Sequence, residues 1–328
     1  MGKKEKTLIE VRDLKKYFEM KSGAFKKRTL KAVDGISFSI KKGEALGLVG
    51  ESGSGKTTAG RTILNMYTPT SGEIFYKGKK IETKSDVAEL RRSASYVFQD
   101  PYSSLNPRMT VSDIIGEPLD VQGLYQSLGE RKEKIDYLIR RVGLNSEHST
   151  RYAHEFSGGQ RQRICIARAL AINPDFVVCD EPVSALDVSI RAEIINMFDE
   201  LRENLKLTYL FISHDLLIVR HICTRIAVMY LGEIMEIADS DSIYEYPLHP
   251  YTKALISAIL IPDPKTTKVG SHINLKDEIP SPINKPSGCP FRTRCPEAKA
   301  ICEEQKPPMR EFYKDHFVAC HRVEELIK

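Results

Sequence analysis

The chain has 328 residues, of which 41% are hydrophobic and 28% are charged. That length allows one large domain with an appendage, or two domains, and the composition is ordinary for a soluble globular protein. No apolar run is long enough to cross a membrane, and residues 1–6 lack the apolar region of a signal peptide. The net charge of +5 is scattered rather than striped, which argues against a nucleic-acid-binding surface. We therefore expect a cytosolic protein.

The N-terminal part predicts a small antiparallel β layer. Residues 8–11 are an apolar run, and Ile36, Phe38 and Ile40 alternate with serines, which is the pattern of a half-buried strand. Residues 73–76 continue this layer.

A glycine-rich loop follows the next apolar strand, residues 45–49. It reads Gly50-Glu51-Ser52-Gly53-Ser54-Gly55-Lys56-Thr57, in the spacing G-x-x-x-x-G-K-[ST] of a P-loop. In such a loop backbone N–H groups surround the phosphates, Lys56 reaches the β and γ phosphates, and the hydroxyl of Thr57 meets Mg²⁺. The flanking strand and helix favour this interpretation over a flexible surface loop.

A loop and a helix are predicted after the strand-like residues 94–97. Gln99 precedes a segment that contains Pro101 and Pro107, and two prolines so close together forbid a continuous helix. Residues 131–142 then carry apolar side chains at helical spacing, so an amphipathic helix is predicted there.

The segment Ser157-Gly158-Gly159-Gln160-Arg161 begins another predicted helix, which runs to Pro174. Ser157 and Gln160 have the spacing of a capping box, in which each side chain bonds the other residue's backbone N–H. A helix N-terminus that is capped by serine and lined with two glycines is a site for an anion.

Two acids follow a short apolar run, residues 176–179, that has the pattern of a strand covered on both faces. Asp180 and Glu181 therefore stand at a strand end, where open α/β sheets bind ligands, and they are well placed to hold a metal and orient a water. A further apolar strand, residues 209–212, ends just before His214. We expect the P-loop, the two acids and His214 at one edge of one sheet.

Together these residues resemble an ATP-binding cassette protein, and the diagnostic piece is the family's signature sequence at residues 157–161. The resemblance implies an α/β fold: a P-loop NTPase core with a mostly parallel sheet, an antiparallel β layer, a helical insert and a small cysteine-rich C-terminal extension. It implies a cassette domain over residues 1–240, with the insert at about 99–172, and an extension over residues 241–328.

The resemblance also implies an enzyme that binds ATP and Mg²⁺ and hydrolyses the ATP. Glu181 would polarise the attacking water, His214 would contact the γ-phosphate and the base, and Gln99 would touch Mg²⁺ or the water. The implied Mg²⁺ ligands are Thr57, Gln99 and Asp180. The implied nucleotide-binding set is Phe18, Gly50, Ser52, Gly53, Ser54, Gly55, Lys56, Thr57, Thr58, Gln99, Asp180, Ser157, Gly158, Gly159, Gln160 and Asp187.

Some of these roles have alternatives. Phe18 is expected against adenine, with Tyr17 as the alternative, and either ring could equally be a core aromatic of a strand. Ser157 and Gly159 would complete the site of a partner subunit, so an isolated chain should be a poor catalyst. Asp187 would cross the interface of the ATPase dimer, or it caps the next helix, since aspartate is a preferred N-cap.

Residues 100–106, 229–234 and 247–253 resemble, more narrowly, the oligopeptide and dipeptide permease branch, and residues 104–111 look like its second ATPase subunit. This implies a peripheral protein on the cytoplasmic face of the membrane that energises peptide import. The implied partners are two transmembrane permease subunits, which the insert contacts, a second, paralogous ATPase subunit and, indirectly, an extracytoplasmic peptide-binding protein; no nucleic acid is expected. The alternative is a soluble cassette ATPase that acts in DNA repair or translation, although such proteins usually carry paired cassettes or a long coiled-coil insertion.

The cysteines fall into two groups. Cys165, Cys179 and Cys223 lie singly in apolar runs and are predicted to be core residues, whereas Cys289, Cys295, Cys302 and Cys320 cluster near the C-terminus. A reducing cytosol favours metal over disulfides, but the spacing is neither that of structural zinc nor that of common ferredoxins. From the residues alone, a metal site, disulfides and free thiols all stay open.

The resemblance adds to this, because some members of the peptide-permease branch carry a four-iron four-sulfur (4Fe-4S) cluster on four C-terminal cysteines. These four cysteines match in order, so we expect such a cluster in a structural role. His316 and His321 keep zinc as an alternative. A third interpretation makes the metal a redox sensor that gates the ATPase.

Overall fold

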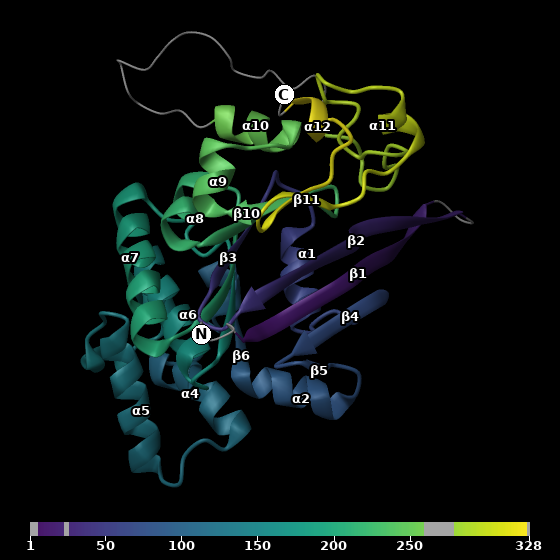
Figure 1. The fold of residues 1–328 in the computed structure, drawn as a ribbon. Coiled ribbons are helices and arrows are strands. Elements are labelled where there is room, and N and C mark those ends of the chain that lie inside the picture. Colours follow the sequence, from purple (N-terminus) through teal and green to yellow (C-terminus); the bar gives the residue numbers. More distant parts are fainter. Residues whose placement is uncertain (1–5, 23–25, 259–278, 327–328) are drawn as a thin grey trace, which may run out of the picture. The chain divides into compact units, whose positions relative to one another are not determined.

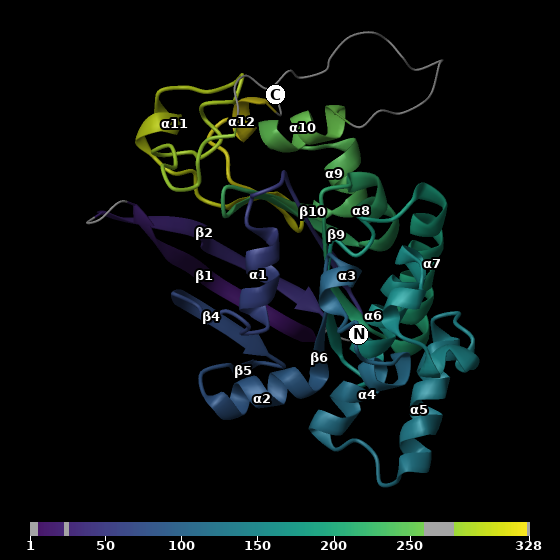
Figure 2. The ribbon, with the colours of Figure 1, turned by 180° about the vertical axis from the view of Figure 1, so that it is seen from behind.

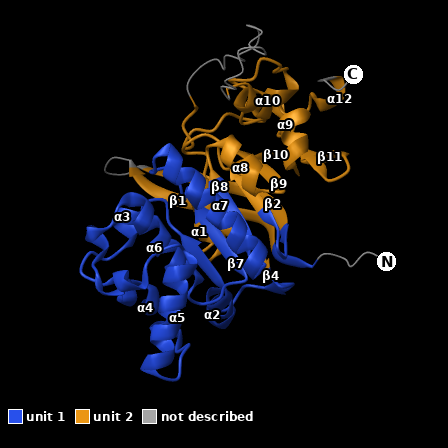
Figure 3. Ribbon diagram, turned by 90° about the vertical axis from the view of Figure 1, so that its left-hand side faces the viewer, with its two compact units in different colours: residues 1–9, 40–45, 76–212 blue, residues 10–39, 46–75, 213–328 orange. Residues whose placement is uncertain are grey.

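The computed structural model describes residues 6–22, 26–258 and 279–326. The chain divides into two compact units, which Figure 3 colours blue and orange. Unit 1 comprises residues 1–9, 40–45 and 76–212, and unit 2 comprises residues 10–39, 46–75 and 213–328.

Unit 1 contains a parallel set of strands, in which β7 pairs with β6 on one side and with β8 on the other. All five residues of β7 are buried, as expected for a strand covered on both faces. The strands of this unit are β5 (Lys79–Lys80), β6 (Ala94–Val97), β7 (Phe176–Asp180) and β8 (Thr208–Ser213). Its helices are α2 (Lys84–Ser93), α3 (Pro101–Ser104), α4 (Val111–Gln122), α5 (Leu128–Arg141), η1 (Ser146–Thr150), η2 (Ala153–Glu155), α6 (Gly158–Leu170) and α7 (Val188–Leu205).

The helices α4, α5 and α6 pack on one another within unit 1, and α3 and α7 also contact α6 (Figures 1 and 2). The helix predicted from residue 131 begins earlier, at Leu128, because the side chain of Ser127 accepts a hydrogen bond from the N–H of Glu130 and caps it. The segment predicted to be a loop after Gln99 contains one helical turn, α3. Pro101 is at the first position of this turn, where a missing N–H costs nothing, and Asp100 caps it.

Unit 2 contains a mixed sheet. Strand β3 pairs in parallel with β9, β9 pairs antiparallel with β10, and β12 joins β10 to β11 by antiparallel pairing. In a separate sheet β1 lies between β2 and β4. The strands that lie wholly or mostly in unit 2 are β1 (Thr7–Ser22), β2 (Lys26–Lys41), β3 (Ala45–Val49), β4 (Ser71–Tyr76), β9 (Arg225–Tyr230), β10 (Glu233–Asp239), β11 (Arg310–Tyr313) and β12 (His316–Val318). The helices are α1 (Lys56–Ile63), α8 (Leu216–Ile222), α9 (Ser240–Glu245), α10 (Pro250–Ser257), α11 (Ile301–Glu304) and α12 (Val323–Leu326).

The predicted α/β class is confirmed, with mixed sheets in the structure, but the C-terminal residues do not form a compact unit of their own. The described residues 279–326 belong to unit 2 together with residues 46–75, which include the P-loop. The physical reason is that β12 extends the sheet at β10, and Val318 and Val323 are buried in a small cluster with Leu248. The C-terminal region is therefore part of the sheet and core of this unit.

Within the described ranges, none of the helices combines the length and the apolar character that a membrane span requires.

Candidate nucleotide-binding site

The P-loop of unit 2 is shaped by glycines that no other residue could replace without strain. Gly50 and Gly55 have φ values of 151° and 103°. A Cβ atom would lie 2.1 Å from the carbonyl oxygen of Met229 at the first position and 2.1 Å from that of Ala32 at the second. The N–H of Gly232 donates to the carbonyl of Ser54 at 2.7 Å. The loop is thus held closely against the turn that follows β9.

Lys56, the first residue of α1, places its ammonium group inside this loop. Its side chain is buried, and Nζ donates to the carbonyl oxygens of Gly50 at 2.7 Å and Glu51 at 3.0 Å. Thr57 and Thr58 follow in the first turn and are half-buried. A buried ammonium group, a helix N-terminus and exposed loop backbone at Ser52 and Gly53 together form a cradle for an anion such as phosphate.

The two aromatic candidates for the adenine contact have different surroundings. The hydroxyl of Tyr17 donates to Asp34, whose other carboxylate oxygen accepts from Lys285 at 2.9 Å. Burial and this hydrogen bond raise the pKa of Tyr17. Phe18 packs edge-on against Tyr67, with ring centroids 5.5 Å apart. Both rings are half-buried, so the choice between them stays a prediction.

His214 follows the last residue of β8 and is exposed in unit 2. Its neighbour Asp215 caps α8 by accepting from the N–H of Leu217 at 3.0 Å. The cap sets the start of α8 at Leu216, and β8 ends at Ser213. His214 therefore lies in the short connection between this strand and this helix.

In unit 1, Asp180 and Glu181 mark the end of β7, as predicted. Asp180 is fully buried and accepts a hydrogen bond from the hydroxyl of Tyr96 at 2.7 Å. Glu181 has a φ of 44°, in the left-handed region that is unusual for a residue other than glycine. Its N–H donates to the carbonyl of Ile212 at 2.9 Å, and its own carbonyl accepts from the N–H of Ser184 at 3.2 Å. The chain therefore turns sharply at Glu181, which is the kind of backbone strain that clusters at functional sites.

Gln99 and Glu181 lie in direct contact. The Nε2 atom of Gln99 donates to Oε2 of Glu181 at 3.0 Å. Sequence reasoning missed Tyr96, the partner of Asp180. The sequence carried no signal for this contact, because it depends on the pairing of β6 with β7, which puts Tyr96 beside Val178, two residues before Asp180.

The signature segment has the predicted capping box. The N–H of Ser157 donates to Oε1 of Gln160 at 3.1 Å, and the N–H of Gln160 donates to Oγ of Ser157 at 3.4 Å. A Cβ atom at Gly159 would lie 2.4 Å from Cγ2 of Ile190, so this glycine lets α6 approach α7 closely. Asp187 precedes α7 and is exposed, but its side chain makes no capping hydrogen bond, which does not support the capping alternative.

The predicted site residues are divided between the two units. Unit 2 contains Phe18, His214 and the whole P-loop, whereas unit 1 contains Gln99, the two acids, the signature segment and Asp187.

The prediction of a 4Fe-4S cluster is wrong. The described residues include all four C-terminal cysteines, and among these residues no group of three or more His, Cys, Asp or Glu side chains could hold a metal ion. Zinc is unsupported for the same reason, and the redox-sensor interpretation is no longer tenable. Burial raises the pKa of Cys289 to about 12 and that of Cys295 to about 11, so both thiols stay protonated at neutral pH.

The two histidines that kept zinc as an alternative have other partners. Nε2 of His316 lies 2.7 Å from Oε1 of the fully buried Glu236, and Nε2 of His321 lies 3.0 Å from the carbonyl oxygen of Gln305. The predicted core positions of Cys165, Cys179 and Cys223 are confirmed, because all three are buried.

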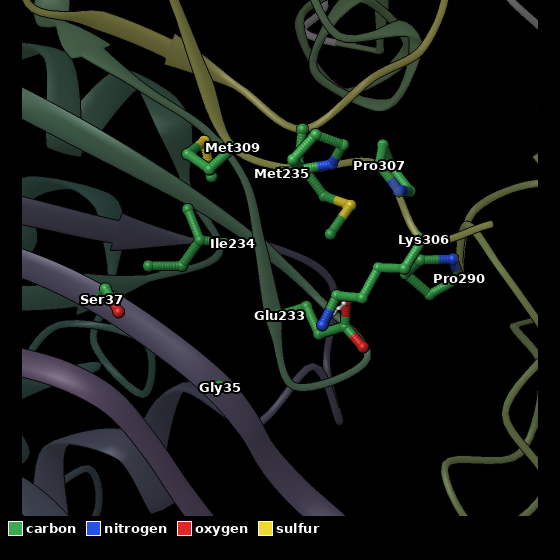
Figure 4. A pocket seen from close by; sticks show the side chains of 11 residues that line it. Gly35, Ser37, Glu233, Ile234, Met235, Pro290, Lys306, Pro307 and Met309 are labelled. Atoms are coloured by element: carbon green, nitrogen blue, oxygen red, sulfur yellow. Dashed lines mark ion pairs between the residues drawn. The ribbon is translucent and has the colours of Figure 1, made fainter. Parts of the chain in front are cut away.

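A cavity of about 280 Å³ lies in unit 2, and none of its lining residues belongs to the P-loop (Figure 4). Its walls include Met235, Pro307 and Met309, and its charged groups neutralise each other. Nζ of Lys306 is 2.9 Å from a carboxylate oxygen of Glu233. This cavity has no anion cradle and is not the nucleotide site.

Comparisons with known proteins agree with this geometry. Residues 33–184 match the family model described as ABC transporter. In structure, the chain resembles the ATP-binding cassette MJ0796 bound to ADP and Pi, with a TM-score of 0.64 and 27% identity, over 71% of this chain and 99% of that one. The chain is thus an ATP-binding cassette ATPase of the transporter class.

The group within that class follows from three further matches. Residues 235–302 match the model described as Oligopeptide/dipeptide transporter, C-terminal region. The chain is 54% identical over 326 residues to the oligopeptide transport ATP-binding protein AppF of Bacillus subtilis, covering 97% of this chain and 98% of the relative. It is 48% identical to the oligopeptide transport ATP-binding protein OppF of Haemophilus influenzae, covering 96% and 97%. The chain belongs to this family of oligopeptide transport ATP-binding proteins.

Proposed function

We propose that this chain is the ATP-hydrolysing subunit that energises import of oligopeptides or dipeptides through a membrane ABC transporter. The observation that carries the ATP-binding part is the buried ammonium group of Lys56 inside the glycine loop, where it donates to backbone carbonyls of Gly50 and Glu51. Phosphate oxygens are the natural further acceptors for such a group. The peptide part is supported by relatives named for oligopeptide transport that match nearly the whole chain. The DNA-repair or translation alternative has no comparable support.

In this proposal each nucleotide contact has a named residue. The backbone of Gly50 to Gly55 and the side chain of Lys56 hold the β and γ phosphates, with Thr58 beside them. Phe18 stacks on adenine, with Tyr17 as the alternative. Ser157 and Gly159 complete the site of a second ATPase subunit, and Asp187 crosses that interface.

Mg²⁺ would be held by oxygen atoms of Thr57, Gln99 and Asp180, and it would neutralise charge on the transferred phosphoryl group. The donor set fits, because Mg²⁺ takes carboxylate, hydroxyl and amide oxygens. Asp180 is a fully buried carboxylate, a group that requires a cation or hydrogen bonds to remain charged.

Glu181 acts as the general base in this proposal. Its carboxylate accepts a hydrogen bond from Gln99, which helps to orient the group that takes a proton from the attacking water. His214 contacts the γ-phosphate and helps to hold the base in place.

The helical insert, at about residues 99–172, docks on the two transmembrane permease subunits in our proposal. Three large apolar side chains in it are strongly exposed: Tyr102 at 61%, Val121 at 81% and Leu128 at 79%. We propose these side chains as the first positions to test for contact with the permease subunits. We further propose a cassette domain over residues 1–240, a C-terminal region over residues 241–328 and a paralogous second ATPase subunit. The complex lies at the cytoplasmic face of the membrane and receives peptide from an extracytoplasmic binding protein.

The test is reconstitution. The full chain is co-expressed with its permease subunits and the second ATPase subunit, placed in proteoliposomes, and assayed for ATP-dependent uptake of labelled peptides with the peptide-binding protein present. We expect uptake that the Lys56→Ala variant abolishes. ATPase activity that depends on RNA or DNA, without association with membrane subunits, would contradict the proposal.

A further inference from the structure

The second residue of the P-loop is a glutamate, and this is an electrostatic problem for a loop that receives a polyphosphate. Glu51 lies between Gly50 and Ser52, and its side chain is 25% exposed. A carboxylate so close to the phosphate site repels an anionic ligand unless its charge is neutralised.

Arg294 supplies this neutralisation from a distant part of the sequence. Its Nη1 donates to Oε2 of Glu51 at 2.6 Å and its Nη2 donates to Oε1 at 3.0 Å. This is the two-pronged geometry in which arginine binds a carboxylate most strongly. The Arg294 side chain is only 7% exposed, so solvent screens the pair weakly. The hydrogen bonds to Glu51 raise the pKa of Arg294, which therefore remains charged.

The rest of Glu51 is fixed by unit 2 as well. Its N–H donates to the hydroxyl of Tyr251 in α10 at 2.9 Å, and its carbonyl accepts from Lys56 at 3.0 Å and from the N–H of Ser54 at 3.2 Å. Two of the groups that hold this P-loop residue, those of Tyr251 and Arg294, thus come from the C-terminal region.

A buried aromatic cluster explains why Arg294 stays in place. Phe291, three residues earlier, is fully buried, with its ring centroid 5.3 Å from that of Tyr230 and 5.2 Å from that of Tyr251. The N–H of Arg294 donates to the carbonyl of Phe291 at 3.0 Å, and its guanidinium lies over the ring of Tyr230, 5.8 Å from the centroid. Tyr230 ends β9, directly before the turn that contacts the P-loop.

We propose that Arg294 is a positioning residue of the nucleotide site: it neutralises Glu51 and holds the P-loop in the form that accepts ATP. The inference rests on the proposal that the P-loop binds nucleotide. It assigns Arg294, within the segment from Cys289 to Cys302, a role in nucleotide affinity that requires no metal.

The experiment measures the Kd of the full chain for ATP in the presence of Mg²⁺ by titration calorimetry. Arg294→Met leaves a carboxylate without its cation beside the phosphates, and we expect affinity to fall roughly tenfold, since the lost contacts are charge-assisted. Arg294→Lys keeps the charge but cannot make the two parallel hydrogen bonds that the guanidinium makes to Glu51, so an intermediate Kd is expected. The Glu51→Gln/Arg294→Met double variant removes both charges and should recover most of the loss.

Arg292→Met is the matched control. Arg292 lies in the same segment, but its side chain bonds the carbonyl of Ser287 at 3.0 Å and Glu303 at 3.3 Å instead of the P-loop. We expect its Kd for ATP to equal that of the unchanged chain. Equal affinities of the Arg292→Met and Arg294→Met variants would overturn the inference, and so would a double variant as weak as Arg294→Met, because a merely structural arginine predicts no recovery.

Two further points keep the test decisive. Should Arg294→Met not fold, Arg294→Lys and the double variant still give the comparison, because neither leaves an unneutralised carboxylate. If the unchanged chain itself did not bind ATP, the proposed function would fail, whereas normal binding with no effect at Arg294 would remove this inference alone.

Coupling between two sites is reciprocal, which gives a second readout. ATP with Mg²⁺ should slow amide hydrogen exchange across residues 287–303 in the unchanged chain. The Arg294→Met variant should lose this protection even at saturating ATP, and retained protection would count against the proposed coupling.

Discussion

The P-loop and the C-terminal cysteine segment each contain a group of chemically distinctive residues, and each group predicted a binding site. The P-loop has the predicted strand, loop and helix, whereas the cysteine segment lacks the predicted metal site among the described residues. The P-loop residues lie within eight consecutive positions, and hydrogen bonds such as that from Lys56 to Gly50 join neighbours in sequence. The four C-terminal cysteines are spread over residues 289–320, and the described residues contain no metal-binding group. A motif is a dependable guide to geometry when the backbone of the motif itself creates that geometry.

The largest effect is expected at the predicted base. Glu181→Gln should preserve ATP binding and lower turnover roughly 10²- to 10⁴-fold, because the amide cannot take the proton from water. Steady-state ATPase assays of the assembled transporter, beside nucleotide-binding titrations, measure both quantities. Glu193→Gln is the control. Glu193 is an exposed acid on α7 that pairs with Arg163 of α6, and its replacement should leave turnover unchanged. Normal turnover of Glu181→Gln would remove Glu181 from the mechanism.

The next effect tests the local architecture of the P-loop. Lys56→Ala removes a buried ammonium group from the loop, and we expect affinity for ATP to fall by about 10²-fold or more, since charge-assisted hydrogen bonds to phosphate are the strong ones. Fluorescent-nucleotide titration gives the Kd. Lys253→Ala on α10 is a matched lysine removal outside the P-loop. Tight binding by the Lys56 variant would overturn the assignment of this loop to phosphate.

A third prediction concerns how the C-terminal region is held, which is by buried polar contacts instead of metal. His249 is buried, its Nδ1 accepts from the N–H of Tyr251 at 3.0 Å, and its backbone N–H donates to Glu236 at 3.0 Å. Burial lowers the pKa of His249 to about 4, although Glu236 opposes that shift and Lys253 adds to it. Protonation would also cost the hydrogen bond from Tyr251.

The sign of the pH effect follows from the two states. The unfolded chain, with histidine near its ordinary pKa of about 6.5, takes up the proton before the folded chain does. The stabilisation is therefore complete above pH 6.5 and is lost as the pH falls toward 4, by up to about 3 kcal/mol of unfolding free energy. Chemical denaturation at several pH values measures it. His249→Asn, which can still accept from the Tyr251 N–H, should show a flatter profile, and an identical profile would contradict the assignment.

The smallest effect is expected at the cysteines. Cys295 is a free, half-buried thiol, so Cys295→Ser should change the unfolding free energy by less than about 1 kcal/mol. Cys165→Ser, at a buried core position, is the comparison and should cost more, because a hydroxyl is costlier to bury than a thiol even with Oγ of Ser104 beside it, 3.3 Å from Sγ in the unchanged chain. A loss of several kcal/mol at Cys295 would indicate a cross-link or metal tie at this position.

Much of the fold could be predicted because the relevant signals are local. The strand over residues 45–49 was found with its bounds, and the capping box of Ser157 and Gln160 has the expected hydrogen bonds. The short helix α3 was missed because proline ends helices in general but is well suited to the first position of one, where Asp100 supplies the cap.

The sequence by itself determined the class of protein and the chemistry of its loop, since glycine spacing, strand pattern and the signature segment each depend on neighbouring residues. Only the tertiary structure decided which distant side chains meet. It paired Tyr96 with Asp180, Gln99 with Glu181, and Arg294 with Glu51 across 243 positions of sequence. Such contacts depend on how strands and segments pack, and residue spacing along the chain carries no information about that.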